Sequence, residues 1–214
     1  MSDPCQPGQP GAYPSDCDIR EAYRTMARER TQGSGLEREH RVVLDKAKDI
    51  KILLLDVDGV LTDGTLLYSS SGEESKSFNT QDGFGLRLLR EAGIETGLIS
   101  ARSSEAVGRR ARELRITFVY QGAGSKLEAF QEILRKSGCR PFEIAYMGDD
   151  WLDLVLLSRV GLACAPRNAV QAVREAAHYV TCRPGGCGAV REVCDLLLEG
   201  KGLATELLQR YMSR

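Results

Sequence analysis

Two carboxylates stand two residues apart at Asp56 and Asp58, directly after the apolar run Ile52–Leu55. One such carboxylate can attack phosphorus, while the other protonates the leaving oxygen and then activates a water molecule. A calcium-binding loop is the alternative, but the later ligand positions of an EF-hand hold no acidic residue here. The segment therefore favours chemistry on a phosphate group.

Two further polar segments could bind that phosphate. Ser100, with the amides of Ala101 and Arg102, follows an apolar run that ends at Ile99. A hydroxyl and free amides at a helix start can cradle a phosphate, although serine is also a common helix N-cap. Lys126 opens the next predicted helix, and only its place after these motifs distinguishes it from an ordinary surface lysine.

A cluster of acidic residues follows the apolar run that ends at Met147, and it contains Asp149, Asp150 and Asp153. Carboxylates gathered at the end of a buried strand repel one another unless a cation neutralises them. Hard oxygen ligands suit Mg²⁺. The cluster therefore predicts a magnesium site.

These segments share one predicted scaffold, an α/β domain with a doubly wound, mainly parallel sheet. Short apolar runs alternate with stretches of helical spacing such as Ser104–Leu114 and Leu127–Leu134. The predicted strands are Ile52–Leu55, Thr96–Ile99, Thr117–Tyr120, Glu143–Met147, Leu162–Cys164 and Tyr179–Thr181. Ligands bind at the carboxyl ends of such strands, where every polar segment falls. A β-hairpin of Leu66–Tyr68 and Glu73–Phe78 is predicted as an insertion after the first strand.

In their order along the chain, the polar segments resemble those of the haloacid dehalogenase superfamily. The resemblance implies that Asp56 is the nucleophile and Asp58 the general acid and base. It also implies that Ser100 and Lys126 hold the phosphate and take part in catalysis. The dehalogenases of the superfamily lack the second aspartate of the first segment, so its presence at position 58 indicates phosphoryl transfer.

The same resemblance implies a set of magnesium ligands. Asp149 would bind Mg²⁺ together with the Asp56 carboxylate and the Asp58 carbonyl oxygen, and Asp150 and Asp153 would support the site.

A closer resemblance, over about residues 45–200, is to the family of 3-deoxy-D-manno-octulosonate 8-phosphate phosphatases. It rests on the segments DVDGVLTDG, GEESKSFNTQDGFGL, ISAR, YQGAGSKL, YMGDDWLD and GGCGAVREVCDLLL. This family lacks a separate cap domain and forms tetramers, in which the hairpin and the glycine-rich C-terminal segment help close the active sites. The resemblance implies a magnesium-dependent phosphatase of a small sugar phosphate that forms a homotetramer and whose product feeds lipopolysaccharide precursor synthesis.

The chain departs from that family at two places: ISAR replaces the usual ITGR, and Gln81 replaces a common basic residue. Arg102 suits a substrate carboxylate. It favours the octulosonate over a nonulosonate 9-phosphate, because an acidic residue often replaces it in the nonulosonate branch. Arg183, in the loop 183–186, could meet the negative charge of the substrate, or the loop could be an exposed turn. A catalytically silent, sugar-phosphate-binding scaffold is the alternative from another class.

The composition indicates a globular protein of the cytoplasm without a nucleic-acid or membrane partner. The 214 residues carry a formal net charge of -1, and no apolar run is long enough to span a bilayer. The seven scattered cysteines, without a predicted export signal, favour reduced thiols. The spacing of His178, Cys182, Cys187 and Cys194 does not match a structural zinc site.

We predict four segments along the chain. Residues 1–17 form a flexible tail and residues 18–49 a helical N-terminal extension, interrupted at residues 33–35. Residues 50–200 form the catalytic domain, and residues 201–214 form a helical C-terminal tail.

Overall fold

The structure, a computed structural model, describes residues 34–70 and 74–213. By its contacts the chain divides into units of residues 1–42 and 43–214. The predicted tail and the first part of the helical extension lie outside the described residues. The second part of the extension is helix α2 (Ser34–Lys48). The break predicted at residues 33–35 differs slightly, because Ser34 and Gly35 already belong to this helix. They stand in its first turn, where the backbone amides have no partner within the helix.

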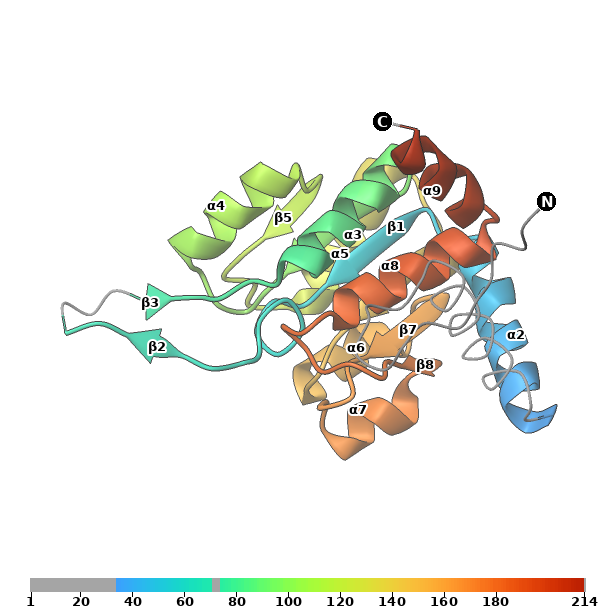
Figure 1. The fold of residues 1–214 in the computed structure, drawn as a ribbon. Coiled ribbons are helices and arrows are strands. Elements are labelled where there is room, and N and C mark those ends of the chain that lie inside the picture. The colour runs from blue at the N-terminus through green and yellow to red at the C-terminus, as the bar shows by residue number, and fades with distance from the viewer. Residues whose placement is uncertain (1–33, 71–73, 214) are drawn as a thin grey trace, which may run out of the picture. The chain divides into compact units, whose positions relative to one another are not determined.

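The centre of the fold is a six-stranded sheet in the order β5-β4-β1-β6-β7-β8 (Figure 1). Every neighbouring pair is parallel. The strands are β1 (Ile52–Leu55), β4 (Glu95–Ile99), β5 (Phe118–Tyr120), β6 (Ile144–Met147), β7 (Leu162–Ala165) and β8 (Tyr179–Val180). The strands fall where the apolar runs predicted them, and the predicted fold class is confirmed.

Helices connect the strands and cover both faces of the sheet. They are α3 (Thr80–Glu91), α4 (Glu105–Leu114), α5 (Lys126–Ser137), α6 (Leu154–Leu157), α7 (Gln171–Ala176), α8 (Ala189–Gly200) and α9 (Ala204–Met212), with short 3₁₀ helices η1 (Pro141–Glu143) and η2 (Trp151–Asp153). Among the described residues, no helix combines the length and the apolar character needed to cross a membrane.

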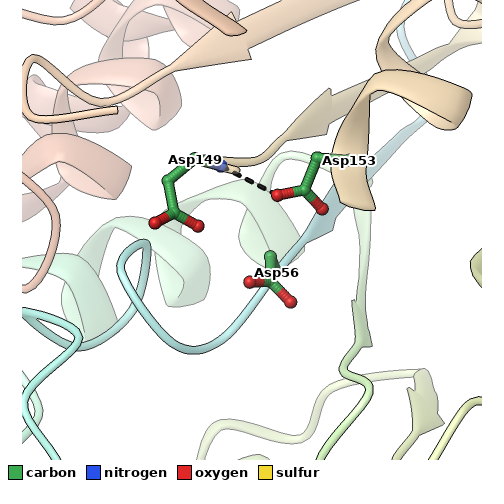
Figure 2. A group of neighbouring side chains, drawn as sticks. All are labelled: Asp56, Asp149 and Asp153. Atoms are coloured by element: carbon green, nitrogen blue, oxygen red, sulfur yellow. Dashed lines mark hydrogen bonds between the residues drawn. The ribbon is translucent and has the colours of Figure 1, made fainter. Parts of the chain in front are cut away.

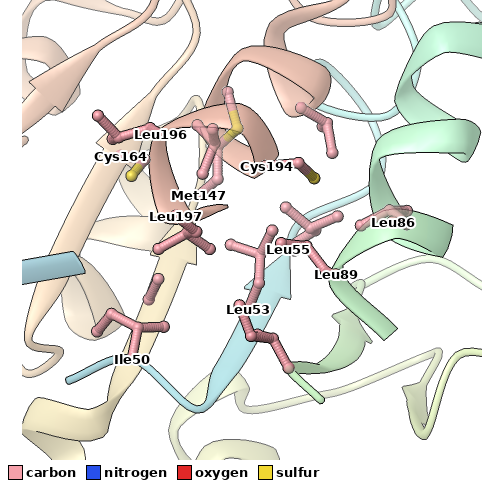
Figure 3. Close-up of a cluster of buried hydrophobic side chains, with 14 of the residues drawn as sticks. Ile50, Leu53, Leu55, Leu86, Leu89, Met147, Cys164, Cys194, Leu196 and Leu197 are labelled. Carbon is pink, nitrogen blue, oxygen red and sulfur yellow. The ribbon is translucent and has the colours of Figure 1, made fainter. Parts of the chain in front are cut away.

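Strand β1 is buried on both faces, as its continuous apolar sequence predicted. Leu53 and Leu55 point into a core that α3 and α8 complete, with Leu89 and Cys194 among its members (Figure 3). The intervening residues of the strand point into a second core with α5, α6 and α7. Alternate burial of this kind gives the central strand apolar contacts above and below, so its end is a rigid platform for the residues that follow.

The predicted hairpin is present as β2 (Leu67–Tyr68) and β3 (Glu74–Ser75), which pair antiparallel. Its strands are shorter than predicted, because no layer of the described residues covers them: Leu67 is 62% exposed. In the described residues between β1 and α3, this hairpin is the only regular structure, in agreement with the absence of a separate cap. At the other end of the chain, the predicted C-terminal helix is α9, which buries Leu207 against the core.

Candidate active site

The fold brings the predicted polar segments to one edge of the sheet. Asp56 directly follows β1, Ser100 follows β4, and Gly148 follows β6. Because β4 and β6 are the two parallel neighbours of β1, these positions lie side by side at the carboxyl edge. Lys126 is the first residue of α5, and it reaches the same place.

A buried lysine connects the two aspartate segments. Lys126 Nζ lies 2.7 Å from Asp56 Oδ1 and 2.6 Å from Asp153 Oδ1, and 3.3 Å from the Tyr146 hydroxyl. All four side chains are buried. Burial acts to lower the pKa of Lys126, but the Asp56 and Asp153 carboxylates together outweigh it and raise this pKa above its ordinary value. The ammonium is therefore charged and neutralises part of the site.

Asp153 is saturated by hydrogen-bond donors. Its Oδ1 accepts from Lys126 and from the Tyr146 hydroxyl. Its Oδ2 accepts from the amides of Asp149 and Asp150 at 2.9 and 3.1 Å, and the first of these bonds is drawn in Figure 2. Four donors leave little capacity for another ligand, so this carboxylate holds its neighbours in place.

Asp56 and Asp149, the two carboxylates beside Asp153, are suited to a divalent cation. Carboxylate oxygens of Asp56, Asp149 and Asp153 lie within 4.8 Å of one another (Figure 2). Burial, helped by the neighbouring Asp56 carboxylate, raises the pKa of Asp149 to about 7. Burial also raises the pKa of Asp56 to about 6, although Lys126 acts in the opposite direction. A hard cation would relieve this crowding, and Asp56 and Asp149 have the oxygen ligands it prefers.

The turn after β1 packs so closely against its neighbours that only glycine fits at Gly59 in the turn and at Gly185 in the C-terminal loop beside it. A side chain at Gly59, whose φ is +88°, would overlap the Asp149 carboxylate. A side chain at Gly185 would overlap the Gly59 carbonyl, and the neighbouring Gly186 amide donates to the Val60 carbonyl at 2.9 Å. The C-terminal glycine loop therefore supports the nucleophile turn of its own chain.

Asp58 belongs to a closed ring of alternating charge, which we call the charge ring (Asp58, Lys76, Glu74 and Arg102). Lys76 contacts Asp58 Oδ1 and lies 2.8 Å from Glu74 Oε1, with only 1% of its side chain exposed. Arg102 Nη2 lies 2.8 Å from Glu74 Oε2, and Arg102 Nε lies 3.7 Å from Asp58 Oδ2. Arg102 Nη2 also donates a hydrogen bond to the Tyr68 hydroxyl oxygen, at 3.0 Å. The hairpin is thus tied to both a catalytic and a substrate-binding candidate.

The predicted phosphate cradle has one buried and two exposed members. Ser100 is buried, and its Oγ accepts from the amide of Arg102 at 3.2 Å. Ala101 is exposed at the same edge. This arrangement places a hydroxyl and backbone amides beside the end of β4, where a phosphate oxygen could accept from them.

Arg183 lies at the glycine loop, and its Nη1 donates to Gln81 Oε1 at 2.8 Å. The residue after Gln81, Asp82, is buried and accepts from the amides of Gly188 and Arg191 at 3.3 and 2.7 Å. These contacts join the start of α3 to the start of α8. Among the described residues, the side-chain hydrogen bond of Arg183 goes to Gln81, and not to the buried carboxylates around Lys126.

The cysteines do not form a metal site in the described part of the chain, where the acidic group around Asp149 is the one candidate found. Cys164 and Cys194 are buried, and burial raises the pKa of both thiols. His178 Nδ1 accepts a hydrogen bond from the backbone amide of Ala163, at 3.0 Å.

Sequence reasoning missed Lys76, Glu74 and Tyr146. Glu74 lies in β3 and Lys76 follows the strand directly, two residues on. This spacing places their side chains on one face of an extended segment, and it was the available signal. Tyr146 lies within a buried apolar strand, where its hydroxyl requires a partner. Neither pattern says which partner that is.

The sheet, the paired aspartates after its central strand and the acidic cluster with its lysine define a haloacid dehalogenase-like hydrolase. The family model with that description matches residues 115–184. A relative in Escherichia coli K12, 3-deoxy-D-manno-octulosonate 8-phosphate phosphatase, is 44% identical over 164 residues, which cover 77% of this chain and 87% of the relative. The chain belongs to the family of 3-deoxy-D-manno-octulosonate 8-phosphate phosphatases.

Solved structures agree with this assignment. The phosphatase of that name from Yersinia pestis is 42% identical with a TM-score of 0.75, and the match covers 76% of this chain and 88% of the other. The Moraxella catarrhalis phosphatase, solved with a magnesium ion, a phosphate ion and a KDO molecule, is 40% identical with a TM-score of 0.77. That match covers 79% of this chain and 97% of the other.

Proposed function

We infer that this protein hydrolyses 3-deoxy-D-manno-octulosonate 8-phosphate to the free sugar acid and phosphate, in lipopolysaccharide precursor synthesis. The observation that carries the inference is the buried contact of Asp56 with Lys126, beside Asp149, in a chain of this family. It joins a nucleophile, a cation for the phosphate and ligands for a metal at one strand end.

In the first step, a carboxylate oxygen of Asp56 attacks phosphorus, and the bond from phosphorus to the sugar oxygen breaks. Asp58 gives its proton to the departing oxygen, which leaves as the free sugar hydroxyl. Lys126, the Ser100 hydroxyl and the amides of Ala101 and Arg102 would neutralise the charge on the transferred group.

In the second step, Asp58 takes a proton from a water molecule, whose oxygen attacks the phosphorus of the aspartyl-phosphate. The bond between phosphorus and Asp56 breaks, so the carboxylate is restored and phosphate is released. One residue thus serves first as acid and then as base, as its place two residues from the nucleophile permits.

Magnesium fits the site on the chemistry of its ligands: Asp56, Asp149 and the Asp58 carbonyl would hold it, with Asp153 and Asp150 in support. When bound, Mg²⁺ supplies positive charge that polarises the phosphoryl oxygens. The residues of the chain keep their own tasks: Lys126 balances charge, and Asp153 orients Lys126 and the turn after β6.

Two arginines are proposed for the sugar acid. Arg102 already donates a hydrogen bond to one carboxylate, that of Glu74, and could donate to the carboxylate of the substrate. Arg183 could meet the negative charge of the substrate from the glycine loop.

We propose a homotetramer in the cytoplasm. Leu66, Leu67 and Tyr68 of the hairpin are 42%, 62% and 56% exposed, and a hairpin of this size cannot enclose a sugar phosphate alone. A neighbouring subunit would supply the missing wall of the site. The five cysteines of the described residues are free thiols, in keeping with a reducing compartment.

The test is phosphate release from a panel of sugar phosphates, with Mg²⁺ and then with EDTA. We expect the octulosonate 8-phosphate to be preferred and EDTA to abolish its hydrolysis. Preference for a nonulosonate 9-phosphate would reassign the substrate. No release from any member of the panel would leave a binding scaffold.

A further inference from the structure

The charge ring places a carboxylate of the protein on the arginine proposed for the substrate. Glu74 Oε2 lies 2.8 Å from Arg102 Nη2, within the strong range for a charge-assisted hydrogen bond. The bond lies at the mouth of the site, because the Arg102 side chain is 43% exposed and Asp58 lies 3.7 Å from its Nε. An incoming carboxylate would therefore meet an arginine that is already occupied.

Glu74 is held in this position from its other side. Its Oε1 lies 2.8 Å from Lys76 Nζ, which is almost fully buried and also contacts Asp58. Hydrogen bonds from Lys76 and then Arg102 lower the pKa of Glu74. Glu74 is thus an ionised carboxylate with two cationic partners, and it retains one of them when the other is taken away.

We propose that Glu74 is a positioning residue: it occupies Arg102 in the empty site as an internal substitute for the substrate carboxylate and is displaced on binding. This inference rests on the proposed function. Only a substrate with its own carboxylate could replace the bond that Arg102 loses. A phosphate ester without one would leave the charge ring closed, so its binding would not depend on Glu74.

The exchange also reaches Asp58. After displacement, Glu74 keeps Lys76 as its remaining partner, and Lys76 is the same ammonium that contacts Asp58. Recognition of the carboxylate at Arg102 and the orientation of the general-acid candidate would thereby be linked through one buried lysine. Glu74 acts through Arg102 and Lys76, so it is a positioning residue and touches no reacting atom.

The test compares two substrates, octulosonate 8-phosphate and ribose 5-phosphate, which lacks a carboxylate. In Glu74→Gln the neutral amide competes less well for Arg102, so KM for the octulosonate should fall by at least about threefold. KM for ribose 5-phosphate should not change. The matched control is Glu206→Gln, which removes an exposed carboxylate paired with Arg210 on α9 and should leave both values unchanged.

A second background separates the exchange from a structural effect. With Arg102→Ala the bond is absent, so the further change Glu74→Gln should leave the ratio of the two KM values as it was. An equal or higher octulosonate KM in Glu74→Gln would overturn the proposal, as would the same shift for both substrates. If the wild-type protein does not hydrolyse the octulosonate, the proposed function fails by itself, and binding of the free sugar acid by calorimetry still tests the exchange at Arg102.

Discussion

Asp56 combines burial with a single strong cation, and this combination decides its chemistry. It is 8% exposed, and its contact with Lys126 at 2.7 Å opposes the effect of burial on its pKa. With that pKa at about 6, the carboxylate is mostly ionised at neutral pH and can act as a nucleophile.

Replacement of Asp56 by Asn should therefore remove activity while the fold persists. An amide cannot form the acyl-phosphate, so we expect kcat to fall by at least about a thousandfold. Steady-state phosphate release measures the loss, and thermal unfolding checks the fold. The control Asp195→Asn, an exposed aspartate on α8, should behave as the wild type. Activity of Asp56→Asn within about tenfold of wild type would contradict the assignment of Asp56 as the nucleophile.

Asp149 makes the metal-free protein sensitive to pH. Its pKa is about 7 in the fold against an ordinary value of 3.8, so the native state binds more protons between pH 4 and 7. Its contribution to the free energy of unfolding is present at the acid end and is lost as pH rises through this window. Relative to Asp149→Ala, the metal-free wild type should lose about 1–2 kcal/mol between these limits, after allowance for solvent screening.

Chemical denaturation of both proteins in EDTA, at several pH values, measures this difference. Added Mg²⁺ should then raise the unfolding midpoint of the wild type at pH 7, but not that of Asp149→Ala. A midpoint in the variant that responds equally to Mg²⁺ would place the cation elsewhere.

At the scale of elements, two turns from distant parts of the chain form one structure. The loop at Gly185 lies against the carbonyl of Gly59, and a methyl group there would force the two turns apart. We expect Gly185→Ala to lower kcat at least about tenfold, because small displacements of catalytic groups are costly. Gly108→Ala in α4 is the control: its added methyl would meet nothing closer than 3.5 Å, and it should keep full activity. Equal activity in both variants would show that the contact is dispensable.

The hairpin is the element that relates the single chain to its assembly. Leu67 and Leu208 are equally exposed, at 62%, but the first lies on β2 and the second on α9. If the hairpin joins subunits, Leu67→Asp should shift the protein to smaller species in sedimentation velocity and raise KM. Leu208→Asp should do neither. A fully active wild-type monomer at assay concentration would contradict closure by a neighbour.

Over the whole molecule, sequence reasoning succeeded where local pattern decides structure. The run Ile52–Leu55 could only be satisfied by a strand buried on both faces, and the position of Asp56 followed from it. It failed where a contact depends on how distant elements meet. Lys76 contacts Asp58 only because the hairpin returns the segment after β3 to the turn after β1, and no spacing in the chain predicts that contact. The hairpin strands were predicted too long because alternation does not say whether a second layer exists.

The contact between the two glycine turns also sets an order of events during synthesis. The nucleophile turn around Gly59 leaves the ribosome long before the loop at Gly186 that donates to Val60. Strand β1 likewise cannot pair with β6, one of its two neighbours in the sheet, until β6 has been synthesised. A nascent chain can therefore carry Asp56 and Asp58 without a finished site until residue 186 has been added. The turn that carries the nucleophile therefore gains its last support only after the loop at Gly186 has emerged.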